Sequence, residues 1–191
     1  MQIFFGADSV PTWSSSELSP WLASLKKGKI VAAPAEGVYG YCADPFNPRK
    51  LEKMLEAKQR SLTKGLIVLI SQPSQLAQLS PESLPEECQL AISAYWPGAV
   101  TILLPALRSL PSILTGGLST IAIRLPSCPY MLEYLEAHGG PLCSTSLNIS
   151  GEPPAIVMEQ IPKGVPALTL PTPLSGSVSR IFSPVANSWL R

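Results

Sequence analysis

The chain has 191 residues, the length of one ordinary globular domain. Hydrophobic residues make up 46% of it and charged residues 14%, so there is enough apolar material for a core, and a disordered linker is excluded. The net charge of +1 argues against a protein that coats nucleic acid generally. The apolar runs are much shorter than the ~20 residues of a membrane helix. Residues 1–8 lack the pattern of a secretory signal, so we expect a cytoplasmic protein.

The first third of the chain predicts a helix, a strand and a second helix. Ser19-Pro20 is typical of a helix start, and we expect a short helix over 21–27 that ends at Gly28. A buried strand follows over 29–33. Asn47-Pro48 predicts a capped helix, and the apolar spacing after it places Lys58 at the end of the buried stripe.

The rest of the chain alternates in the same way. We expect helices over 85–95 and 129–138, and strands over 65–71, 99–104, 119–125, from 141 to 144, and near 167–170 and 178–182. Strands that alternate with helices predict an α/β fold, with a twisted mixed β-sheet flanked by helices. We expect one domain over residues 1–191.

Cysteine and histidine exclude several kinds of chemistry. The four cysteines, at positions 42, 88, 128 and 143, contain no Cys-x-x-Cys pair, so a zinc ribbon is not expected. We expect them to be reduced thiols in the core. His138 is the single histidine and precedes Gly139-Gly140, which is typical of a helix C-terminus. The mechanism should therefore work without imidazole.

Positive charge is concentrated in one window. Residues 49–64 contain six Lys and Arg against two Glu, an excess of four, whereas residues 65–107 contain no Lys or Arg. A solvated helix face would explain this window. An anion site would explain it as well, because Lys58, Arg60 and Lys64 combine compact charges with a planar guanidinium suited to phosphate oxygens.

Two other segments also suit an anion. Residues 144–151 place four hydroxyls and the Asn148 amide after an apolar strand, where α/β proteins bind ligands, although a serine-rich turn explains the same residues. Thr120 and Arg124 are four apart on one expected strand and so face the same side of a sheet. An arginine among apolar neighbours is costly unless an anion meets it. Because phosphate loops of the Walker and dinucleotide types are absent, these residues alone predict a phosphate or carboxylate pocket and no more.

Five segments together resemble the YrdC family, the threonylcarbamoyl-AMP synthases, in its short bacterial form. They are PAEGVYG at 34–40, Lys58-Gln59-Arg60 with Lys64-Gly65, Trp96-Pro97-Gly98 with Thr101, TIAIR at 120–124, and STSLNISG at 144–151. The resemblance is strongest over 29–154, and it implies that residues 155–191 form a C-terminal extension that closes over the site.

The resemblance implies a nucleotidyltransferase that uses ATP with Mg²⁺, L-threonine and bicarbonate. Its products would be threonylcarbamoyl-AMP and pyrophosphate, and a tRNA-modifying threonylcarbamoyl transferase complex would use the first of them. By resemblance, Lys58 and Arg60 would be catalytic, and no protein residue would bind metal. The residues expected at ATP are Lys58, Arg60, Lys64, Thr120, Ser146, Asn148 and Arg191. Those expected at threonine are Arg124, Ser144, Ser179 (or its neighbour Arg180) and the position of Ala35.

The sequence departs from the family pattern near the same residues. Ala35 stands where the family usually has Thr, Leu147 where it has Ala, and Tyr41 where it has Leu. The alternative is therefore a double-stranded RNA- or tRNA-binding paralogue with weak or no synthase activity, for which the basic window also argues. A carbamoyl-transfer domain of the hydrogenase-maturation type is disfavoured, because such domains belong to much longer chains.

Overall fold

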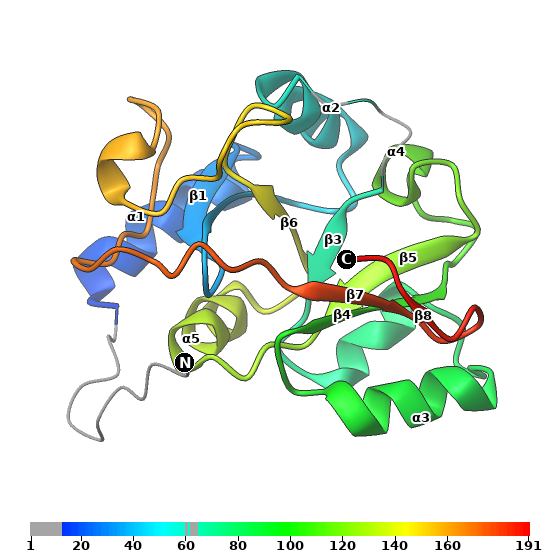
Figure 1. Cartoon of the computed structure of the whole chain (residues 1–191). Helices are drawn as coiled ribbons and strands as arrows, with labels where there is room; N and C mark the ends of the chain where they lie inside the picture. The colour runs from blue at the N-terminus through cyan, green and yellow to red at the C-terminus, as the bar shows by residue number, and fades with distance from the viewer. Residues whose placement is uncertain (1–12, 60, 62–64) are drawn as a thin grey trace.

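The computed structural model describes residues 13–59, 61 and 65–191. Their centre is one mixed sheet whose strands follow the order β1-β2-β6-β3-β5-β4-β7-β8 (Figure 1). The pairs β3–β5 and β4–β7 are parallel and the other neighbours are antiparallel. The strands are β1 (Val31–Pro34), β2 (Tyr39–Ala43), β3 (Ile67–Leu69), β4 (Val100–Pro105), β5 (Thr120–Arg124), β6 (Leu142–Ser146), β7 (Arg180–Ser183) and β8 (Ser188–Trp189).

Helices pack around this sheet. They are α1 (Ser15–Lys26), α2 (Pro48–Ala57), α3 (Glu86–Tyr95), α4 (Ser112–Thr115) and α5 (Pro129–His138), with 3₁₀ turns η1 (Pro73–Gln78) and η2 (Met158–Gln160). Helix α1 contacts β1 and α5, where the rings of Trp21 and Tyr134 lie 5.5 Å apart, while α2 contacts β2 and α3 contacts β4. The predicted α/β class, with helices flanking a mixed sheet, is confirmed. Among the described residues, the helices are too short or too polar to cross a bilayer.

The ends of two helices confirm the local chemistry of the sequence. The Asn47 side chain accepts a hydrogen bond from the Lys50 amide (3.3 Å) at the start of α2, and Leu51, Met54 and Leu55 form its buried stripe. Gly139 ends α5 with a φ of +82°, as expected for the residue after His138. Burial lowers the pKa of His138, so the neutral imidazole is favoured there.

Several predicted boundaries are wrong. Helix α1 begins before residue 21, because the Glu17 carboxylate accepts from the Ser14 amide (3.0 Å) and caps an earlier start. Strand β6 continues through Ser146, so three of the four hydroxyls in 144–151 lie in the strand and not in the loop after it. Strand β2 directly follows the 34–38 turn and was not predicted. The strand expected near 167–170 is a single bridge between Ala32 and Ala167.

The two faces of the sheet differ, and this difference positions the site. In β5, Ile121 and Ile123 are buried in the core, while Thr120, Ala122 and Arg124 point to the opposite face. Residues 171–179, which we call the strap, cross in front of that second face (Figure 1). The Gly176 amide donates to the Gly37 carbonyl (2.7 Å) and attaches the strap to the turn after β1.

Candidate functional site

A cavity of about 260 Å³ lies between the strap and the open face of the sheet. Its walls come from the turn after β1, from β3, β5 and β6, and from the C-terminal residues. Seven of the predicted site residues line it: Ala35, Thr120, Arg124, Ser144, Ser146, Ser179 and Arg191. Segments that are far apart in the sequence therefore meet at one cavity, and four of the five ordered segments contribute residues to its wall.

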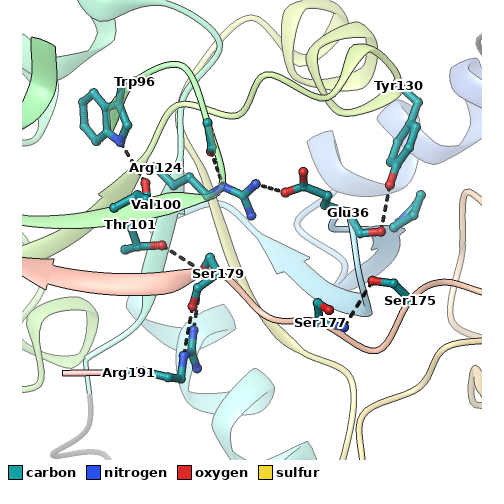
Figure 2. Close-up of polar contacts among 12 residues, drawn as sticks. Glu36, Trp96, Val100, Thr101, Arg124, Tyr130, Ser175, Ser177, Ser179 and Arg191 are labelled. Carbon is teal, nitrogen blue, oxygen red and sulfur yellow. Dashed lines mark hydrogen bonds and ion pairs between the residues drawn. The ribbon is translucent and has the colours of Figure 1, made fainter. Parts of the chain in front are cut away.

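Arg124 is a buried cation on the cavity wall. The residue is only 3% exposed, and its Nε donates to the Gly98 carbonyl oxygen (2.9 Å). Its Nη2 forms an ion pair with the carboxylate of Glu36, which points toward it from the turn after β1 (Figure 2). The sequence indicated that an anion meets Arg124, and a bound anionic ligand there stays a prediction. Within the protein that anion is Glu36, a residue of the 34–40 segment for which the sequence indicated no role.

The backbone around Glu36 holds this carboxylate in place. Glu36 has a φ of +70°, in the left-handed region that favours glycine. The Tyr130 hydroxyl donates to its carbonyl oxygen (3.0 Å), and the Ala35 amide donates to the Val38 carbonyl (2.8 Å) across the turn. Burial raises the pKa of Tyr130, so its hydroxyl remains a donor at neutral pH. Sequence reasoning missed Tyr130, since a tyrosine inside a helix is ordinarily a core residue.

Ala35 and Ser144 lie side by side on the cavity wall. A Cβ atom added to Gly40 would lie 2.7 Å from the Ser144 Oγ and 3.8 Å from the Ala35 Cβ, so both border the small space over this glycine. The residue expected to be Thr in the family is thus beside a hydroxyl that lines the cavity. The loss of the Thr hydroxyl at position 35 therefore removes a polar group from the cavity wall itself.

Lys58 is joined to the cavity through Ser146. It caps the C-terminus of α2 and is 2% exposed. Its ammonium donates to the carbonyl and hydroxyl oxygens of Ser146 (3.3 Å to Oγ) and to the carbonyl (3.1 Å) and Oδ1 (2.5 Å) of Asn148. The Ser146 hydroxyl in turn donates to Asn148 Oδ1 (2.8 Å). The described geometry therefore makes Lys58 a residue that organises the 146–148 segment.

The C-terminal residues close one side of the cavity. Thr101 and Ser179 share a hydrogen bond between their hydroxyls (2.9 Å), and the Arg191 Nε donates to the Ser179 carbonyl (3.1 Å), as Figure 2 shows. Between the two alternatives left open, Ser179 lines the cavity, whereas the Arg180 guanidinium stacks 3.6 Å from the centre of the Trp189 ring. Ser179 of the strap thus contributes a hydroxyl to the cavity, whereas the next residue, Arg180, packs on the Trp189 ring.

Two predicted residues, Arg60 and Lys64, lie outside the described residues. Gly65, the residue that follows Lys64 in the sequence, lines the cavity. In the described part of the chain, no group of three or more His, Cys, Asp or Glu side chains is placed to hold a metal ion. The described lining itself consists of cationic, hydroxyl and apolar side chains, which suits an anionic ligand.

Comparison with known proteins gives the same family in sequence and in structure. The Sua5_yciO_yrdC family model, described as "Telomere recombination", matches residues 23–169. A threonylcarbamoyl-AMP synthase of Alkalilimnicola ehrlichii is 40% identical over 167 residues, 86% of each chain, and one of Vibrio campbellii is 38% identical over 73% of this chain and 76% of its own length. A crystal structure of Pyrococcus abyssi Sua5 complexed with L-threonine matches with a TM-score of 0.80 at 28% identity. It covers 91% of this chain, which spans 52% of that one.

Proposed function

This chain belongs to the Sua5/YciO/YrdC family, and we propose that it is an L-threonylcarbamoyladenylate synthase that joins L-threonine, CO₂ from bicarbonate and ATP. The family resemblance expected from the five segments is confirmed by the matching family model and by curated relatives that are named for this activity. Those names do not favour the alternative of an RNA-binding paralogue without synthase activity. The chain is therefore a nucleotidyltransferase whose product is used in tRNA modification.

The observation that carries the proposal is the convergence of cationic and hydroxyl groups on one cavity. Arg124 enters it from β5, Ser144 and Ser146 enter from β6, and Ser179 enters from the strap. The carbamate of threonine and ATP are both anions, so their reaction depends on positioning and charge neutralisation more than on proton transfer. This lining provides both.

We assign two neighbouring subsites to the two substrates. Arg124 would bind the threonine carboxylate beside Ser144 and Ser179. Arg60 and Lys64 would neutralise the triphosphate, while the buried Lys58 would hold Ser146 and Asn148, which with Thr120 and Arg191 would bind the nucleotide. The ammonium of threonine loses a proton to solvent, and the free amine takes up CO₂ and releases a second proton to form a carbamate. The carbamate oxygen then attacks the α-phosphorus, and the bond to pyrophosphate breaks.

Mg²⁺ would enter this site with ATP. The side chains of the described lining offer hydroxyls but no carboxylate, so the ion would be held by phosphate oxygens and water, with the Ser146 and Thr120 hydroxyls as protein oxygens of a suitable kind. Bound there, Mg²⁺ would neutralise phosphate charge. The protein's own part is to place the carbamate oxygen opposite the leaving pyrophosphate.

A contact with RNA is a further part of the proposal. The turn after α1 lies against α2, since a Cβ on Gly28 would be 3.1 Å from the Lys50 Cε, and Lys26, Lys27 and Lys29 are neighbours of Gly28 along the chain. Such a cluster suits the phosphate backbone of the tRNA whose modification uses the product. A cytoplasmic location agrees with that use. Binding of tRNA should weaken steeply with salt, and a response flat in salt would contradict the contact.

The decisive assay follows pyrophosphate. With ATP, L-threonine and labelled bicarbonate, the chain should release pyrophosphate only when all three are present, and label should appear in an adenylate. Release that ignores threonine contradicts the proposal, as does no release beside an active relative under the same conditions. In calorimetry, Arg60→Ala should weaken ATP binding far more than threonine binding, and equal weakening would contradict its place on the triphosphate.

A further inference from the structure

Glu36 and Arg124 form a pair of opposite charges that spans the edge of the cavity. The Arg124 side chain is 4% exposed and lies on the cavity wall, whereas the Glu36 side chain is 39% exposed and reaches it from the outer side. Figure 2 shows the two side chains pointing toward each other, with the hydroxyls of Thr101 and Ser179 on the neighbouring strand and strap. Any carboxylate that binds Arg124 therefore also lies close to the Glu36 carboxylate.

Neither member of this pair is free to move away. The Arg124 guanidinium is anchored by its Nε to the Gly98 carbonyl (2.9 Å). The backbone at Glu36 is held by Tyr130, whose hydroxyl donates to the Glu36 carbonyl (3.0 Å), and by the strap, which bonds to the next residue, Gly37. A non-glycine residue with φ near +70° persists only when its surroundings determine its conformation. The position of the carboxylate is thus a built feature of the site.

This arrangement has an electrostatic consequence for any ligand. A simple carboxylate on Arg124 would meet the like charge of the nearby Glu36 carboxylate. An α-amino acid avoids that repulsion, because its ammonium is bonded to the carbon that bears its carboxylate and can lie against Glu36. We infer that Glu36 binds the α-ammonium while Arg124 binds the α-carboxylate, so that the pair selects α-amino acids over 2-hydroxy acids of the same skeleton. This inference rests on the proposed function, which makes an amino acid the substrate.

The test compares L-threonine with the acid in which a hydroxyl replaces its amine, 2,3-dihydroxybutanoate of matched configuration. Calorimetry measures both ligands with the wild-type chain, with Glu36→Gln, and with Glu82→Gln as a control that removes one exposed carboxylate before α3. Gln keeps the size of Glu and an oxygen that can accept from Arg124, so Glu36→Gln changes mainly the charge. Thermal unfolding of each variant checks the fold.

We expect the wild-type chain to prefer threonine strongly. Glu36→Gln should weaken threonine binding about tenfold or more, the worth of one hydrogen bond between charged groups, and should leave the hydroxy acid unchanged or bound more tightly. Glu36→Asp should restore part of the preference, and Glu82→Gln should not alter it.

Five results would overturn the inference. Equal weakening of both ligands by Glu36→Gln would make Glu36 only a support for Arg124, and tighter binding of both would make it a competitor for the guanidinium. A wild-type chain that binds the two ligands equally would refute the selection without any variant. If the wild-type chain binds no threonine at all, both the inference and the proposed function fail, whereas threonine binding with an unchanged preference in Glu36→Gln refutes the inference alone.

Discussion

Replacing Lys58 by Met tests whether its ammonium organises the 146–148 segment. Met has a similar length and no donor, so the substitution keeps the packing at the end of α2 and removes the charge. The carbonyl oxygens of Ser146 and Asn148 and the Asn148 Oδ1 would then lose a buried donor. Two of these three acceptors are backbone carbonyl oxygens, which cannot rotate to reach another donor.

The magnitude follows from these contacts. A hydrogen bond to a charged group contributes ~1.5–3 kcal/mol, but the bonds at one ammonium are not additive. A buried acceptor left without its donor costs ~1–3 kcal/mol, and three acceptors lose theirs here. Ser146 and Asn148 are half-buried, so water can reach part of the segment and the lower end applies. We expect a loss of about 3 kcal/mol in the free energy of unfolding, or roughly 6–12 °C in Tm for a chain of this length.

Urea and thermal unfolding followed by circular dichroism measure this loss. Lys53→Met on the same helix is the matched control, because Lys53 is exposed and its loss should change the free energy of unfolding by less than ~0.5 kcal/mol. ATP binding should weaken in Lys58→Met and not in Lys53→Met. A loss below ~1 kcal/mol in Lys58→Met would refute the view that its ammonium holds the segment.

Three more predictions concern the strap, the cavity wall and a buried thiol. In Gly37→Ala the new Cβ would lie 1.9 Å from the Ser177 carbonyl oxygen, so the strap must shift. We expect a loss of ~1–3 kcal/mol in the free energy of unfolding and faster proteolytic cleavage in 171–179. An unchanged cleavage rate would contradict this. Ala35→Thr adds a hydroxyl beside Ser144 and should tighten threonine binding about three- to tenfold by calorimetry, while no change would argue for another amino acid. Burial raises the pKa of Cys42 from 9.0 to about 12, so above about pH 9 the thiol ionises only in the unfolded chain and stability falls as pH rises. In Cys42→Ala the free energy of unfolding should fall less with pH than in the wild-type chain, by up to ~1.4 kcal/mol per pH unit between about pH 9 and 11. Urea unfolding measures this, and the same pH dependence in both chains would contradict it.

The sequence predicted those parts of the molecule that depend on neighbours along the chain. The Asn47-Pro48 start of α2, the end of α5 at Gly139 and the alternation in β5 follow from backbone capping and from side-chain periodicity, which act over a few residues. The family's ordered segments also identified residues that line the cavity.

Local sequence patterns could not predict which strands pair or which distant residues come into contact. Strand β6 extends through Ser146 because it pairs with β2, a partner more than a hundred residues away in the sequence. Only the fold brings the strap against Gly37 and the Lys58 ammonium against Asn148.

The role of Glu36 shows the division most clearly. Its charge was visible in the sequence, but its contact with Arg124 required a left-handed turn held by Tyr130 and the strap. Residue types and short spacings therefore determined which chemistry was present in this chain, and the tertiary structure decided which charges face each other, since electrostatic partners are chosen by distance in space and not along the chain.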